Sequence, residues 1–174
     1  MLSFKNKNAE ILLLAEQLDE IYEREPWHGK GVKAILDWVN PNVVFERPNG
    51  QHSILELLWH MMNWKEFALN RLIRSDKDLQ HFEESDWREL DPTHKTLWSE
   101  GLNRFWEAHR QFMEALRKQD DKLLNQIVQG RKYNYRKLLN GIREHDLYHS
   151  GQIAYINKLL TDHQRQLAVE SKAI

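Results

Sequence analysis

Apolar residues recur every three or four positions through four long stretches of this chain, and this spacing restricts its fold more than any other feature. It is the spacing of an amphipathic helix whose apolar stripe faces a core. The first stretch carries Ile11 and Leu18 on such a stripe, with charged residues on the opposite side. The four stretches cover residues 9–24, 53–73, about 92–116 and about 134–160. Because the alternating pattern of strands is missing, we expect an all-α fold in the form of a four-helix bundle.

Two of these helices have a recognisable start. Ser53 and Glu56 form the capping-box pattern, in which each side chain bonds the backbone of the other, in front of the second helix. Asp91 is the expected cap of the third helix, and Pro92 would then occupy its first position, where proline is tolerated.

The remaining segments read as connections. Pro26 ends the first helix, and a long connection with one short helix, VKAILDWV at 32–39, leads to the second. A charged stretch at 75–89 separates the second helix from the third. With 174 residues and no internal repeat, the chain is expected to form one domain over residues 1–174.

Composition excludes several classes of protein. The chain has 25 Lys and Arg against 26 Asp and Glu, so it has no excess positive charge with which to bind nucleic acid. It has no cysteine, and therefore neither disulfides nor a thiol nucleophile of its own. The apolar run in MLSFKNKNAEILLLAEQL is interrupted by acidic residues too early for a signal peptide or a membrane span. We therefore expect a cytoplasmic protein without a membrane partner.

Three histidines lie on apolar stripes of the predicted helices. His145 and His149 stand four positions apart on the fourth helix. Side chains at that spacing are about 5–6 Å apart, close enough for two imidazoles to reach one divalent cation. His60 lies among large apolar residues in the middle of the second helix. Because a bundle brings such stripes together, His60 is the expected third ligand.

Spacing alone also admits a simpler interpretation. Nine histidines in 174 positions supply roughly half of one H-x-x-x-H pair by chance. A single buried histidine is, moreover, more often a core residue bonded to a carbonyl group. Three buried histidines together slightly favour a metal site over three separate core histidines. One ion satisfies three ring nitrogens that would otherwise each need a partner. Glu144 and Asp146 fit two roles equally well, orienting a ligand imidazole or carrying solvated charge.

Structural roles are expected for several other glycines, tryptophans and histidines. Gly141 and Gly151 would leave room beside the histidine pair for a metal, a substrate or a close helix. Trp59 and Trp64 are expected in the core rather than in a pocket. Solvated or capping roles are expected for the six remaining histidines, which are His28, His52, His81, His94, His109 and His163.

Three segments carry a resemblance to a known family. They are PWHGKG at 26–31, ERPNGQHSILELLWHMMNW at 46–64 and REHDLYHSGQI at 143–153. In this order and at these separations they resemble the DinB/YfiT-like metalloenzymes, over nearly the whole chain. The most specific parts are the histidine that follows "HSI" in the second helix and the H-x-x-x-H-x-G-Q-I signature. The sequence departs from the family pattern at no expected ligand position.

The resemblance implies a four-helix bundle of variant topology with long connections, often a homodimer, and a divalent metal held by His60, His145 and His149. Members with known activities resemble thiol S-transferases and isomerases that use bacillithiol, mycothiol or glutathione. The resemblance therefore implies a small-molecule substrate and a low-molecular-weight thiol cosubstrate.

Chemistry narrows the metal but leaves the reaction open. Three neutral imidazoles with open coordination positions suit catalytic zinc or nickel. The nucleophile would be a metal-bound thiolate in S-transfer, which we favour, or metal-bound water in a hydrolase. A metal-binding bundle without catalysis is the remaining alternative.

Overall fold

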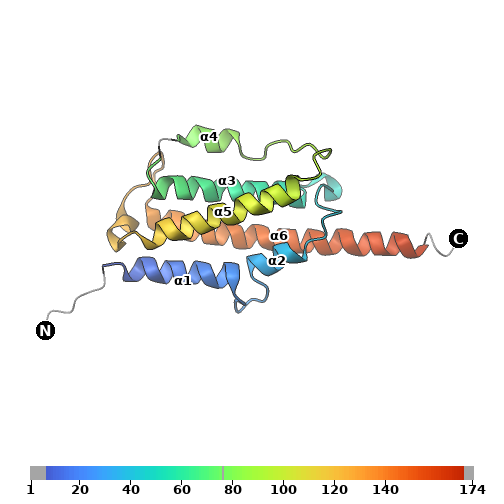
Figure 1. The fold of residues 1–174 in the computed structure, drawn as a ribbon, viewed down its shortest axis with the longest axis horizontal. Coiled ribbons are helices and arrows are strands. Elements are labelled where there is room, and N and C mark those ends of the chain that lie inside the picture. Colours follow the sequence, from blue (N-terminus) through green and yellow to red (C-terminus); the bar gives the residue numbers. More distant parts are fainter. Residues whose placement is uncertain (1–6, 76, 171–174) are drawn as a thin grey trace.

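A computed structural model of the protein describes residues 7–75 and 77–170, and these residues form helices joined by loops (Figure 1). The only strand-like pairing among them is one bridge between Ile127 and Asn134. The long helices are α1 (Ala9–Glu23), α3 (Ile54–Leu72), α5 (Leu97–Arg117) and α6 (Tyr135–Glu170). The short ones are α2 (Val32–Trp38), η1 (Pro48–Gly50), α4 (Leu79–Glu84) and η2 (Asp121–Asn125). The all-α prediction is confirmed.

The four long helices close into a ring. Helix α3 contacts α5 and α6, and α1 contacts the same two helices from the other side. The colours of Figure 1 show that α3 and α5 run in one direction while α1 and α6 run in the opposite one. This arrangement needs long connections, which contain α2 and η1 before α3, and α4 before α5. The result is the four-helix bundle of variant topology that the sequence motifs implied.

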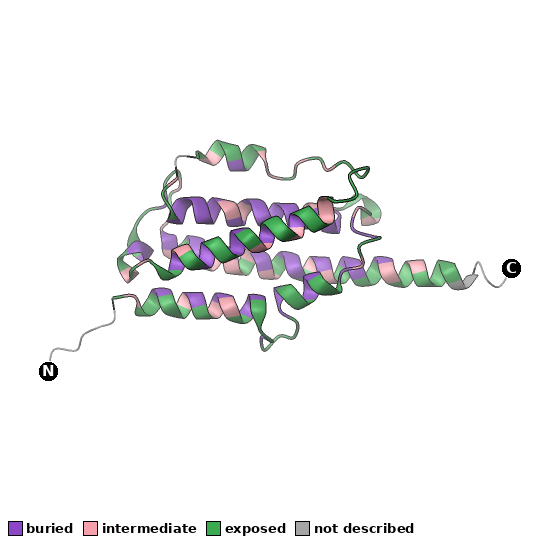
Figure 2. Cartoon of the chain, viewed as in Figure 1, coloured by how far each residue is buried: buried purple, intermediate pink, exposed green. Residues whose placement is uncertain are grey.

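Helix α3 is the most deeply buried element of the bundle (Figure 2). Its Leu55, Leu58 and Met61 are fully enclosed, and they belong to the same core as Phe105 and Phe112 of α5. Burial of apolar side chains of this size stabilises a fold by about 1.5–3 kcal/mol each. A polar residue on α3 therefore faces the protein interior and needs a partner there.

The start of α3 is fixed as predicted. The Ser53 hydroxyl accepts from the backbone N–H of Glu56 at 3.2 Å, and the Glu56 carboxylate accepts from the Ser53 N–H at 2.8 Å. Arg47 donates two further bonds to Glu56, at 3.0 and 2.8 Å. These contacts join the end of the long connection to the helix that carries His60.

The predicted start of the third helix is wrong. Helix α5 begins at Leu97, because the Asp91 carboxylate caps a turn instead of a helix, accepting from the N–H and hydroxyl of Thr93 at 2.9 and 2.8 Å. The His94 N–H closes this turn on the Asp91 carbonyl at 3.1 Å, and Pro92 lies inside it.

Two further elements differ from the prediction. The charged stretch at 75–89 contains helix α4, of which Phe82 is the buried residue. Helix α6 continues to Glu170, past the predicted end at about 160, and its last turns extend beyond the other helices (Figure 1). Leu160 is the last residue of α6 that belongs to the buried core, and the described side chains after it are exposed or half-buried. None of the helices in the described part of the chain has the length and apolar character that crossing a membrane requires.

Gly31 allows the start of α2 to approach the end of α1. A Cβ atom at Gly31 would lie 2.6 Å from the carbonyl oxygen of Arg24 and 2.9 Å from that of Ile21. At Gly141, in α6, a Cβ would meet no atom within 4 Å.

We expect Gly31→Ala to lower the free energy of unfolding in urea by about 1–3 kcal/mol, because the backbone around Arg24 and Ile21 must shift to admit the methyl group. The control, Gly141→Ala, should raise it by about 0.5–1 kcal/mol through helix propensity. Equal stability of the two variants would contradict this account.

Candidate metal centre

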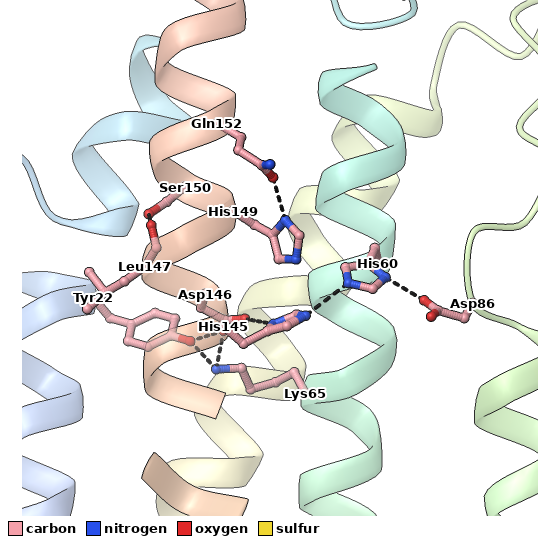
Figure 3. A network of polar contacts seen from close by, with 10 residues as sticks. All are labelled: Tyr22, His60, Lys65, Asp86, His145, Asp146, Leu147, His149, Ser150 and Gln152. Atoms are coloured by element: carbon pink, nitrogen blue, oxygen red, sulfur yellow. Dashed lines mark hydrogen bonds and ion pairs between the residues drawn. The ribbon is translucent and has the colours of Figure 1, made fainter. Parts of the chain in front are cut away.

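His60 on α3 meets His145 and His149 on α6 inside the bundle (Figure 3). One ring nitrogen from each residue lies within 4.8 Å of the corresponding atoms of the other two. The Nε2 atoms of His60 and His145 are 2.9 Å apart. His60 and His149 are each 7% exposed, whereas the side chain of His145 retains 24% exposure, so the group is buried but not sealed. The predicted meeting of the three residues is confirmed.

Each imidazole has an oxygen acceptor at its other nitrogen. The Nδ1 of His60 bonds a carboxylate oxygen of Asp86, that of His145 bonds Asp146 at 2.9 Å, and that of His149 bonds the amide oxygen of Gln152 at 2.7 Å. Because these oxygens can only accept, each Nδ1 carries the proton. In a neutral ring with the proton on Nδ1, the lone pair is on Nε2.

The close approach of the ring nitrogens suits a bound cation. Two unprotonated ring nitrogens at 2.9 Å repel each other unless a proton or a metal ion lies between them. A divalent ion accepts one lone pair from each of the three rings, and the Nδ1 acceptors hold the rings in the orientation that binding requires. The residues present therefore fit a divalent metal ion.

Burial keeps His149 and His60 in the form that binds metal. Burial lowers the pKa of His149 to about 4. The bond to Gln152 opposes this shift, and the neighbouring rings of His145 and His60 add to it. Burial also lowers the pKa of His60, although Asp86 opposes the shift. His149 and His60 are therefore neutral near pH 7, and neutral imidazole is the ligand for metals.

A buried ion pair supports His145 from behind. Asp146 is fully buried and lies 2.7 Å from the ammonium of Lys65, which is also fully buried on α3. The Tyr22 hydroxyl bonds both side chains, and the ring of Tyr22 lies 4.1 Å from the Lys65 ammonium (Figure 3). Burial raises the pKa of Asp146, but Lys65 and His145 together outweigh this effect and hold it well below its usual range. The carboxylate therefore remains charged and holds the proton of His145.

A loop completes the group from outside the bundle. Asp86 and Trp87 follow α4, and the indole of Trp87 stacks on His60 with a ring separation of 3.8 Å. His52 stacks on Trp87 at 3.7 Å. Trp87 adopts a left-handed backbone conformation, with φ of 46°, which a large side chain rarely adopts. Sequence analysis missed both loop residues, because neither belongs to a periodic segment.

An open pocket of about 450 Å³ lies beside the histidines. His149, Gln152 and Trp87 form part of its wall, so the centre and the pocket share residues. Small-molecule sites commonly enclose about 300–1,000 Å³. The size and position of the pocket suit a small substrate next to a metal ion.

The structure also tests what the sequence predicted for the two acids beside the histidine pair and for His109. Of the two acids, Asp146 orients His145, while Glu144 is exposed and pairs with Arg143. The solvated role expected for His109 is wrong, because it is buried and stacks on Tyr22 at 4.0 Å.

The structure also tests the predictions for Gly141, Gly151, Trp59 and Trp64. A Cβ at Gly141 or Gly151 would meet nothing within 4 Å, so these glycines do not make room for a close neighbour among the described residues. Trp59 is a core residue, as expected, and Trp64 packs half-buried against the core.

Comparison with known proteins places these features in a family. A family model described as the DinB superfamily matches residues 12–153, a range that contains all three histidines, Asp86 and Asp146. Searches of curated proteins and of solved structures found no match.

Two variants test whether Lys65 is needed because it balances the charge of the buried Asp146 carboxylate. Lys65→Met leaves the Asp146 carboxylate buried without its counter-charge, so we expect the free energy of unfolding in urea to fall by about 3–5 kcal/mol. The double variant Lys65→Met/Asp146→Asn removes both charges and should recover most of that loss. A double variant as unstable as the single one would show that side-chain packing, not charge, makes Lys65 necessary.

Proposed function

This chain belongs to the DinB superfamily, and we propose that it is a metal-dependent enzyme in which His60, His145 and His149 bind one divalent ion, zinc or nickel. The proposed reaction is the transfer of a low-molecular-weight thiol to a small electrophile. The observation that carries the proposal is the arrangement of the three rings, each with its Nδ1 bonded to an oxygen and its other nitrogen facing the other two.

The number and charge of the ligands support catalysis over a structural role. Structural zinc sites usually have four protein ligands, whereas catalytic sites have three and leave a position for substrate. A divalent ion held by three neutral imidazoles would keep its full charge and would favour the thiolate form of a coordinated thiol. Because the chain contains no cysteine, that thiol comes from outside.

The surroundings of the centre support thiol transfer over hydrolysis. Hydrolysis by an activated water commonly uses a carboxylate as general base. No Asp or Glu is among the described residues that line the pocket. The two carboxylates that contact the histidines, Asp86 and Asp146, already accept the protons of His60 and His145. A thiol that ionises on coordination needs no such base in the pocket.

The chain's own residues would orient the reactants. Asp86, Asp146 and Gln152 hold the imidazoles, while Trp87 covers one face of His60 and limits access of water from that side. His149 and Gln152 lie at the boundary between the centre and the pocket, so a reactant in the pocket would meet the centre there.

Removal of one ligand should affect metal binding more than folding. We expect His149→Gln to weaken zinc binding by more than about 100-fold, because the loss of a ligand exceeds the 10–100-fold loss typical of outer-shell changes. Its melting temperature should equal that of chelator-treated wild type, since the apolar core does not depend on the ion. The measurements are elemental analysis of untagged protein and thermal unfolding. The control, His163→Gln, alters an exposed histidine of the same helix. Full zinc stoichiometry in His149→Gln would exclude His149 as a ligand.

Thiol conjugation tests the reaction itself. Zinc- or nickel-loaded protein should conjugate at least one of bacillithiol, mycothiol, glutathione and coenzyme A to a haloaromatic acceptor. The rate should return to background after chelation and in His60→Gln, His145→Gln and His149→Gln. Cleavage of simple esters or amides without any conjugation would replace this proposal with a hydrolase. The absence of both reactions would leave a metal-binding bundle without catalysis.

A further inference from the structure

The pocket beside the histidines has a chemical character of its own. No Asp, Glu, Lys or Arg is found among its lining residues in the described chain. Its polar groups are the side-chain amides of Asn49, Gln51 and Gln152, two tyrosine hydroxyls, two imidazoles and the indole N–H of Trp87. A carboxylate or phosphate in the pocket would therefore find no lysine or arginine to balance its charge.

Three basic residues are adjacent in sequence to lining residues. Lys158, next to Leu159, is exposed and does not line the pocket, and the two arginines are already engaged. Arg47, next to the lining residue Pro48, donates two bonds to Glu56 at 3.0 and 2.8 Å. Arg88, next to Trp87, lies over the ring of Trp59 at 3.9 Å. Neither guanidinium lines the pocket.

The walls offer flat aromatic surfaces. Tyr148 and Tyr155 line the pocket and are 65% and 70% exposed. Trp87 is covered on its two faces by His60 and His52, so it can present only its edge. Aliphatic side chains fill in between the rings, namely Leu57, Ile156 and Leu159. Aromatic rings in such a setting favour stacked or edge-to-face contacts with another ring.

We infer that this pocket binds the electrophile of the proposed reaction, and that the electrophile is an uncharged, flat ring compound such as a halogenated nitroaromatic. This inference rests on the proposed function. In the reaction, the thiolate sulfur forms a bond with the ring carbon that carries the halogen. The carbon–halogen bond breaks, halide leaves, and the thiol proton passes to solvent. The lining thus disfavours acceptors with carboxylate groups.

Binding without reaction tests the inference separately from catalysis. The probes are 2,4-dinitrotoluene and 2,4-dinitrobenzoate. Both contain the same dinitrophenyl ring and lack a halide leaving group, but the first carries an uncharged methyl group and the second a carboxylate. Equilibrium dialysis uses the full chain after chelation, so that a carboxylate gains no affinity by ligating a metal. We expect the uncharged compound to bind at least tenfold more tightly. Equal binding of the two probes would overturn the inference.

Two variants locate the binding site. Tyr155→Ala removes an exposed ring of the pocket and should weaken binding of dinitrotoluene at least fivefold. Leu159→Arg adds a cation at a half-exposed position and should shift the preference toward dinitrobenzoate at least tenfold. The control, Trp27→Ala, removes an aromatic ring that is 99% exposed and outside the pocket, and should leave binding unchanged. If Tyr155→Ala alters only the sedimentation of the protein, the pocket is covered by a second copy of the chain and the inference is wrong.

The two proposals can fail independently. Selective binding of the neutral ring without metal-dependent conjugation would leave the pocket assignment intact and refute thiol transfer. Conjugation with equal binding of neutral and charged rings would support thiol transfer and refute the pocket assignment.

Discussion

The ion pair between Lys65 and Asp146 sets how α3 lies against α6, and the histidine group depends on that register. Lys65 follows His60 by five positions on α3, and Asp146 follows His145 directly on α6. Both charged groups are fully buried and 2.7 Å apart. A buried pair of this kind adds little net stability, but any shift of one helix along the other would leave two charges unpaired in an apolar core. The register that joins these charges is also the one that brings His60 to His145.

The same carboxylate links the fold to the chemistry of the centre. One oxygen of Asp146 meets Lys65, and the other accepts the proton of His145 at 2.9 Å. Asp86 and Gln152 serve the other two rings from a loop and from the next turn of α6. The loop is held in turn by the stack of Trp87 between His60 and His52, which offsets the backbone strain at Trp87. The orientation of the three rings therefore comes from two parts of the chain, helix α6 and the loop after α4.

The helices and the histidine group could be predicted from sequence because both follow a period. His60, His145 and His149 occupy apolar stripes, and a bundle must bring such stripes together. The start of α5 was mispredicted because Asp91 can cap a turn as well as a helix. Helix α4 was missed because only Phe82 of its residues is buried, and one buried residue makes no stripe.

The residues that support the centre were harder to find, for two different reasons. Asp86 and Trp87 lie in a loop, and their contacts depend on how that loop folds back, which no local pattern encodes. Lys65 and Asp146 did leave a signal, since each charge interrupts an otherwise apolar stripe of its helix. The same reasoning that singled out His60 could have identified them as a buried pair.

A crystal structure of the zinc-loaded protein, with anomalous diffraction data recorded at the zinc edge, tests the central claim most directly. The account predicts one anomalous peak between α3 and α6, at about 2.0–2.1 Å from the Nε2 atoms of His60, His145 and His149. The Nδ1 atoms should keep their bonds to Asp86, Asp146 and Gln152. A peak elsewhere, or an empty centre with the three rings turned apart, would contradict it.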